Sequence, residues 1–194
     1  MDECQLPFNF LLIEETEDGR PWTPASLRTT IQRYLKALPA HATPNWVAGN
    51  HDRHRLASRF GQQLARAVNM LLVLLPGVPT SYYGDELGMP DVFVPWNEVK
   101  DPAALRAGPK LINMTDRDQE RTPMQWTPDP GTNAGFTPAH DPPVKPWLPL
   151  APDFRTRNVQ VQESEQDSEL KLFRSMTALR NGSAAFMGGG TFFM

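Results

Sequence analysis

The segment NWVAGNHDRHRLASRFG, Asn45–Gly61, carries the strongest indication of the fold. It opens with a short apolar segment, Asn45–Gly49, whose length and composition are typical of a buried strand. Asn50, His51 and Asp52 follow directly. In sheets built from parallel strands, functional side chains gather at the carboxyl ends of the strands. We therefore expect these three polar residues to lie at the functional edge of a sheet.

Further strands and helices flank this stretch in alternation. A helical pattern runs from Arg55 to Leu75, and an apolar strand is predicted over Val78–Tyr83. Upstream, Leu6–Ile13 (LPFNFLLI) also predicts a buried strand, and an amphipathic helix begins at Thr23-Pro24 and ends at Pro39. The order strand, helix, strand, helix, strand predicts an α/β fold with three parallel strands and right-handed crossover helices.

The remainder of the chain has a weaker pattern. After Met89 it is rich in proline and predicts a long loop-rich segment that lasts until Ser168. Ser168 can cap a final helix in which Leu172, Met176 and Leu179 share one face. We predict no regular element over residues 181–194.

Composition limits the classes of function. The chain has 194 residues, 40% hydrophobic and 21% charged, with a net charge of −3, which indicates a globular protein. No basic patch interleaves with aromatic residues, so we expect no nucleic-acid partner. Cys4 is the single cysteine, so an internal disulfide or a cysteine-based metal site is not expected. The uncharged stretch from Ala67 to Gly84 contains Pro76, Gly77 and Pro79, which favours a buried helix and strand over a membrane span.

Asn50, His51 and Asp52 are the leading candidates for chemistry. A carboxylate accepts hydrogen bonds and an imidazole donates them, so the pair can hold two adjacent hydroxyls of a sugar. Asp52 can also stabilise positive charge that develops on the sugar. The alternative is that Asp52 only caps the helix that begins near Arg55.

Other polar residues allow two interpretations each. The run Arg117–Arg121, followed by Trp126, could form a sugar-binding lip or a solvated charged loop. The adjacent carboxylates of Asp85 and Glu86 could serve acid/base chemistry, but consecutive side chains seldom converge on one substrate, which favours a structural role. His41 and His54 are isolated histidines that we expect to be exposed rather than to act as ligands.

Several of these segments resemble glycoside hydrolase family 13, in its α-glucosidase (maltase-like) branch. The resemblance covers the predicted sixth, seventh and eighth strands of a (β/α)8 barrel and a loop that covers the active site. The matching segments, in chain order, are LPFNF (Leu6–Phe10), NWVAGNHDRHRLASRFG (Asn45–Gly61), LPGVPTSYYGDELGM (Leu75–Met89), RDQERTPMQW (Arg117–Trp126) and NAGF (Asn133–Phe136). The resemblance implies a partial TIM barrel, made of about its last three β/α units, with a final helix.

The resemblance also implies roles for particular residues. His51 and Asp52 would contact sugar hydroxyls at the cleavage site, Asp52 would stabilise the transition state, and Arg121 would line the site. Asp85 and Glu86 would be structural. The implied substrate is an α-glucoside oligosaccharide such as maltose, with no cofactor and no metal.

The same resemblance sets expectations for the domains. Residues 1–182 would form the C-terminal part of the barrel, including an active-site-covering loop at 90–160, and 183–194 the truncated start of a C-terminal β domain. The nucleophile and general acid of the family follow its fourth and fifth strands, so we expect the chain alone to be catalytically incomplete. A full-length parent would be secreted or membrane-anchored on the outside of the cell.

A second family branch stays open. Heavy chains of heteromeric amino-acid transporters share this barrel, and in that case the partner would be a transporter light chain. Those heavy chains tend to lose the Asn-His-Asp motif, whereas this chain keeps Asn50, His51 and Asp52, which favours the enzyme. A truncated or mis-spliced product without activity is compatible with either parent.

Overall fold

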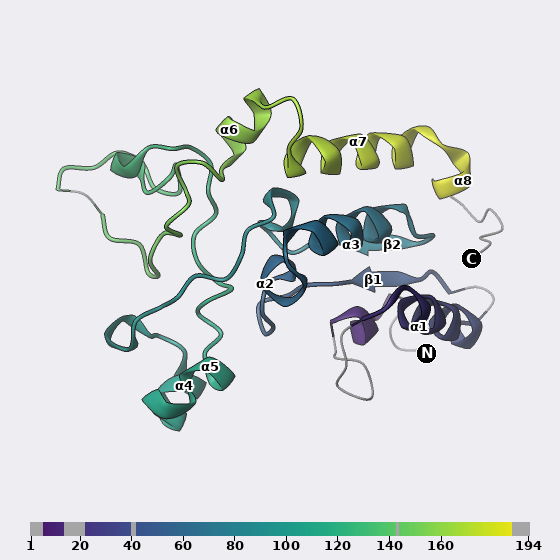
Figure 1. Ribbon diagram of the computed structural model, residues 1–194, viewed down its shortest axis with the longest axis horizontal. Helices are drawn as coiled ribbons and strands as arrows, with labels where there is room; N and C mark the ends of the chain where they lie inside the picture. The colour runs from purple at the N-terminus through teal and green to yellow at the C-terminus, as the bar shows by residue number, and fades with distance from the viewer. Residues whose placement is uncertain (1–5, 14–21, 40–41, 143, 188–194) are drawn as a thin grey trace.

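Two short parallel strands lie at the centre of the computed structural model, which describes residues 6–13, 22–39, 42–142 and 144–187 (Figure 1). Strand β1 (Asn45–Val47) pairs with β2 (Val78–Thr80), and Asn45 lies opposite Val78 in the register. The predicted parallel pairing of these two strands is confirmed. Both strands are shorter than predicted, because each pairs over only three residues.

The connection between β1 and β2 is two helices rather than the single helix predicted. Helix α2 (Leu56–Phe60) ends at Gly61, and α3 (Gln62–Leu74) begins immediately after it. Gly61 has a φ of 75°, a left-handed conformation that only glycine adopts without strain. The apolar residues keep their helical spacing on both sides of Gly61, so the sequence pattern alone does not reveal the break between α2 and α3.

Helix α1 (Pro24–Ala37) confirms the predicted amphipathic helix. Thr23 caps it, because its side chain accepts a hydrogen bond from Ser26 N at 3.1 Å. Its apolar face packs into a core beneath β1, where the Tyr34 and Trp46 rings meet edge to face at 5.1 Å. That core is formed by Leu12, Ile31, Trp46, Ala48, Leu56, Ala57, Ala65, Val68, Leu72 and Leu75.

The predicted strand at Leu6–Ile13 is wrong. The segment forms a 3-10 helix, η1 (Phe10–Leu12), after an extended stretch. The Asn9 side chain accepts a hydrogen bond from Leu11 N at 3.0 Å, and this local bond satisfies the backbone in place of a strand ladder. Leu12 and Ile13 are nevertheless buried, so the apolar run correctly indicated burial but not the backbone conformation.

Residues 90–168 are mostly loop, as predicted, but contain several short helices. Figure 1 shows α4 and α5 together at a distance from the strands. In chain order from Gly84 onward, the short elements are η2 (Asp85–Leu87), η3 (Trp96–Glu98), α4 (Pro102–Ala107), η4 (Pro109–Leu111), α5 (Ile112–Thr115), η5 (Pro130–Thr132) and α6 (Val159–Ser164).

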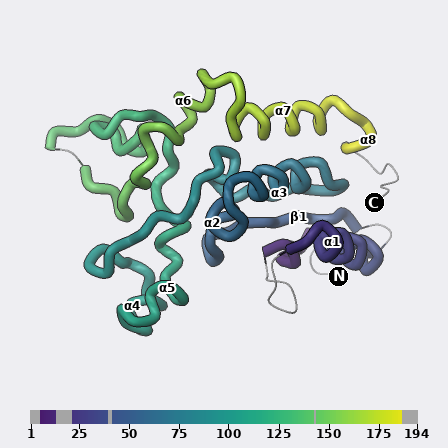
Figure 2. Tube along the Cα trace, in the orientation of Figure 1, coloured from purple at the N-terminus to yellow at the C-terminus, as the bar shows by residue number. Residues whose placement is uncertain are grey.

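The predicted C-terminal helix, α7 (Glu169–Gly182), begins at the predicted cap and runs alongside α3 (Figure 2). Ser168 accepts a hydrogen bond from Lys171 N at 3.2 Å. Leu172 and Met176 line a small pocket against α3, but Leu179 is 47% exposed and does not share the covered face. Buried Arg180 takes its place, donating hydrogen bonds to the Val73 and Leu75 carbonyls at 2.8 Å.

The end of the chain differs from the prediction of no regular element. Helix α8 (Ala184–Met187) follows α7, and residues 188–194 lie outside the described part. Within the described ranges, no helix has the length and apolar character needed to cross a membrane.

Candidate active site

The turn that follows β1 presents two polar side chains to solvent. The Asn50 carboxamide oxygen accepts a hydrogen bond from Asp52 N at 2.9 Å, which closes a tight turn. The side chains of His51 and Asp52 are 65% and 45% exposed. Helix α2 has Arg55 as its N-cap residue, so Asp52 is not its cap. The helix-cap interpretation of Asp52 is therefore wrong.

Two arginines of the run Arg117–Arg121 bind the Asp52 carboxylate. Its Oδ1 accepts hydrogen bonds from Arg117 Nη1 and Arg121 Nη2, both at 2.8 Å. Arg121 Nε also donates to the His51 carbonyl at 2.7 Å, and His51 Nε2 lies 3.4 Å from Asp52 Oδ2. The structure thus brings together the three residues predicted for the site, and adds Arg117.

Arg117 is itself fixed by a buried carboxylate. It pairs with both oxygens of Asp101, through Nε at 2.7 Å and Nη2 at 2.9 Å. These hydrogen bonds hold the pKa of the Asp101 carboxyl far below its usual range and raise that of Arg117. Sequence reasoning missed Asp101; its only local signal, the position before Pro102, indicates a helix cap, a role it also fills.

The run Arg117–Arg121 is not a solvated loop. Asp118 and Glu120 are buried, and Asp118 accepts a hydrogen bond from Asp101 N at 2.9 Å. The run is fastened to the end of β2 by Tyr82, whose hydroxyl donates to the Glu120 carbonyl at 3.2 Å. Buried carboxylates alternate along it with partly exposed residues, so one side is structural, and Arg117 and Arg121 on the other side bind Asp52.

Two tyrosines and a buried arginine hold the same region together. The Tyr83 hydroxyl donates to the Thr122 carbonyl at 2.7 Å. The Arg55 guanidinium lies over both tyrosine rings, 5.2 Å from the centroid of Tyr82 and 4.7 Å from that of Tyr83. The loop that carries Arg117 and Arg121 is therefore anchored to both strand ends.

Asp85 and Glu86 do not face each other as an acid/base pair. Asp85 is 2% exposed and packs beneath the end of β1, where a Cβ added to Gly49 would lie 2.9 Å from its Oδ2. Burial raises the pKa of the Asp85 carboxyl to about 7. Glu86 folds back and accepts a hydrogen bond from Gly84 N at 2.8 Å. Their surroundings support the structural role.

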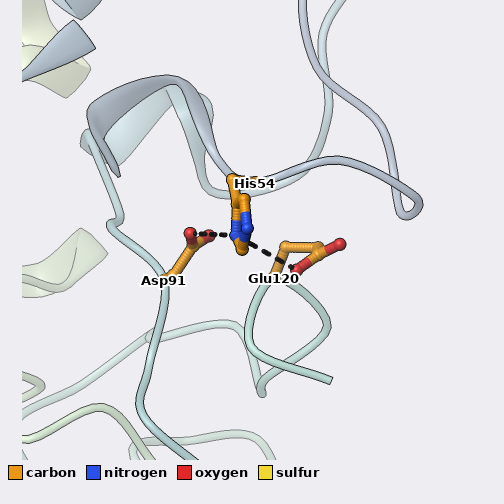
Figure 3. A group of neighbouring side chains, drawn as sticks. All are labelled: His54, Asp91 and Glu120. Atoms are coloured by element: carbon orange, nitrogen blue, oxygen red, sulfur yellow. Dashed lines mark ion pairs between the residues drawn. The ribbon is translucent and has the colours of Figure 1, made fainter. Parts of the chain in front are cut away.

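His54 is partly exposed, as expected, but it is not isolated. Its Nδ1 lies 2.8 Å from Asp91 Oδ2 and 4.0 Å from Glu120 Oε2 (Figure 3). Neither carboxylate was linked to His54 by sequence reasoning, because the three residues are far apart in the chain. His41 lies outside the described residues.

Paired parallel strands, crossover helices and a polar site at the strands' carboxyl ends define an α/β protein with the site placement of the barrel enzymes. The family described as alpha amylase, catalytic domain, matches residues 2–189. The chain belongs to this family.

Known relatives include both enzymes and transporter subunits. The salivary alpha-glucosidase of Aedes aegypti is 43% identical over 177 residues, covering 91% of this chain and 29% of the relative. The human amino acid transporter heavy chain SLC3A1 is 35% identical over 181 residues, covering 92% of this chain and 23% of the relative. The chain therefore spans less than a third of the length of these relatives.

The fold of this chain is also similar to part of a solved enzyme structure. The crystal structure of an alpha-glucosyl transfer enzyme, XgtA, superposes with a TM-score of 0.78 at 34% sequence identity. The match covers 94% of this chain and 32% of that enzyme.

Proposed function

We propose that these residues form the sugar-holding part of an α-glucosidase active site. The observation that carries the proposal is the Asp52 carboxylate, exposed at the end of β1 beside the His51 imidazole and oriented by Arg117 and Arg121. The proposed substrate is an α-glucoside oligosaccharide of the maltose type, without a nucleic-acid partner.

The arrangement suits both binding and charge stabilisation. The two guanidinium groups engage Oδ1, while Oδ2 lies on the side of the His51 ring. Oδ2 would accept a hydrogen bond from one sugar hydroxyl, and the imidazole would donate one to its neighbour. When the glycosidic bond breaks, positive charge develops on the sugar ring, and the Asp52 carboxylate would stabilise it. Arg121 would line the site.

Cleavage needs two more carboxylates. A retaining enzyme uses a nucleophile and a general acid about 5–5.5 Å apart. Two carboxylates of this region are already engaged: Asp101 binds Arg117, and Asp118 accepts hydrogen bonds from backbone N–H groups. Neither is available to attack or protonate a substrate. The 194-residue chain would therefore hold sugar without cleaving it.

The fold belongs to the same proposal. β1 and β2 would be the seventh and eighth strands of a (β/α)8 barrel, with residues 1–182 as its C-terminal part and 90–160 as the loop that covers the active site. Residues 183–194 would be the truncated start of a C-terminal β domain. The parallel pairing of the strands, the α2–α3 crossover and the superposition on the glucosyl transfer enzyme support this arrangement.

The transporter heavy chain is the second candidate, because the human heavy chain is 35% identical to this chain. In that case the partner would be a light chain, and the turn at Asn50–Asp52 would bind no sugar. The exposed and oriented Asp52 supports the enzyme instead.

Calorimetric titration with maltose tests the proposal. The wild-type chain should bind maltose, and Asp52→Asn should weaken binding about tenfold or more, because a hydrogen bond to a charged group contributes about 1.5–3 kcal/mol. The matched control is Asp167→Asn, which alters a carboxylate that is 79% exposed and paired with Arg66. Maltose binding that is absent in the wild type, or equal in Asp52→Asn, would refute the sugar-holding role.

The same preparation tests the missing chemistry. We expect no turnover of nitrophenyl-α-glucoside above the buffer rate. Turnover that disappears in Asp52→Asn would mean that the catalytic pair lies within these residues.

A further inference from the structure

Three potential metal ligands from separate segments meet beside the candidate active site. His54 lies just before α2, Asp91 follows η2, and Glu120 lies in the run Arg117–Arg121, here called the charged loop. His54 Nδ1 lies 2.8 Å from Asp91 Oδ2 and 4.0 Å from Glu120 Oε2, and one ligand atom of each residue lies within 4.8 Å of the others. Figure 3 shows the imidazole between the two carboxylates.

Glu120 supplies an independent sign that something is bound there. The residue is 1% exposed, and its Oε2 has no hydrogen-bond partner among the described residues. A buried polar atom without a partner is costly, and a bound ion is one of the explanations for such an atom in a folded protein. The unpartnered oxygen is the one that faces His54.

Asp91 is already oriented for a ligand. Its Oδ1 accepts a hydrogen bond from Arg55 N at 2.8 Å, and its own N–H donates to Ser58 Oγ at 2.7 Å. These bonds fix the carboxylate at the start of α2 and leave Oδ2 toward His54. Ligands held in this way by surrounding groups are typical of metal sites.

The ligand types select a class of ion. Imidazole nitrogen and carboxylate oxygen are both ligands that Zn²⁺ takes in proteins. Zinc sites with an open position have three protein ligands and a water molecule. Ca²⁺ and Mg²⁺ prefer a shell made of oxygen alone. The His54 side chain is 45% exposed, which leaves room for solvent ligands.

We propose that His54 Nδ1, Asp91 Oδ2 and Glu120 Oε2 bind a divalent transition-metal ion such as Zn²⁺. The ion would join the turn after β1 to the charged loop. His54 lies two residues after Asp52, and Glu120 directly precedes Arg121. The ion would therefore fix the two segments whose side chains meet at Asp52. The metal site does not depend on sugar binding.

Zinc titration of the untagged, chelator-treated 194-residue chain tests the site. We expect one equivalent of Zn²⁺ to bind, and Co²⁺ to give visible absorption bands of a low-coordinate site. Glu120→Gln and His54→Ala should each weaken Zn²⁺ at least about 100-fold, since even indirect ligand partners contribute 10–100-fold. The controls are Glu165→Gln and His140→Ala, which change exposed residues elsewhere.

Each other result overturns the proposal. The absence of stoichiometric Zn²⁺ binding would leave an ion pair between His54 and Asp91 alone. Binding that survives in both variants would place the ion elsewhere, and tighter binding of Ca²⁺ or Mg²⁺ would exclude a transition-metal site. If Glu120→Gln fails to fold by circular dichroism, His54→Ala, which changes a half-exposed side chain, decides the question.

Discussion

At the scale of the residue, Asp52 depends on contacts that span the chain. Its own turn is local and could be expected from Asn50-His51-Asp52, and the resemblance led to Arg121. Arg117 and Asp101 could not be assigned in this way, because their pairing joins segments 16 residues apart and then reaches Asp52 across 65 residues. Sequence patterns indicate the type of each charge but not the partner that three-dimensional folding brings to it.

Asp85 shows the opposite case, a carboxylate whose surroundings work against its charge. Burial raises its pKa to about 7 from an ordinary 3.8, so the folded protein keeps a proton that the unfolded chain releases. The linked stability is fully present below about pH 4 and is lost as pH rises through about 7.

Asp85→Asn should therefore raise stability at pH 8 by about 4 kcal/mol and leave it little changed at pH 4. Urea unfolding at several pH values measures the effect, with Asp167→Asn as the exposed control. An Asp85→Asn protein that keeps the wild-type dependence of stability on pH would show that the Asp85 carboxyl is not the titrating group.

Among the secondary-structure elements, capping residues predicted the helix starts correctly, whereas only two of the three apolar runs predicted as strands form strands. Thr23 and Ser168 begin α1 and α7 as expected, because a cap is a local hydrogen bond. The run at Leu6–Ile13 is buried but not a strand, since burial alone does not select backbone geometry. Strand pairing depends on a neighbour that periodicity does not reveal.

The helix break at Gly61 makes a separate prediction. Gly61→Ala should destabilise the protein by about 1–2 kcal/mol, because an alanine at a φ of 75° is strained. Beyond its chain neighbours and the helix backbone, no atom of the described residues lies within 4 Å of the added Cβ, so the cost comes from the backbone conformation.

Gly182→Ala is the matched control. In the described part of the chain its Cβ also meets no atom within 4 Å, and its backbone is helical, so the change should be neutral or slightly stabilising. Thermal unfolding of the two variants gives the comparison. Equal stability of both would mean that α2 and α3 do not need the break at Gly61.

At the scale of the whole molecule, the fold is divided into separate cores. One core lies beneath β1, a second forms where η2 and Met124 meet α7, and a third supports α4. The strands β1 and β2 alone cannot close a barrel. Helix α7 is connected to the first core largely through α3 and through the hydrogen bonds of Arg180. The number and order of such cores could not be predicted from the sequence, because residues 90–160 have little periodicity.

Arg180→Met should loosen this connection. It removes charged donors from the Val73, Leu75 and Gly77 carbonyls, and we expect a loss of about 2 kcal/mol or more. Relative to the wild type, amide hydrogen exchange in the Arg180→Met protein should accelerate more in α7 than in α1. Arg174→Met, which removes an exposed ion pair to Glu163, should have little effect. Equal effects of the two variants would exclude a special role for Arg180.

The central claim is that sugar binds at the turn after β1, between His51, Asp52 and Arg121. An NMR titration of the isotopically labelled chain with maltose tests it most directly. We predict backbone amide shifts concentrated at residues 50–54 and 117–121, saturating with maltose and absent in Asp52→Asn. Saturable shifts confined to other parts of the chain, or shifts at this turn that persist unchanged in Asp52→Asn, would contradict the account.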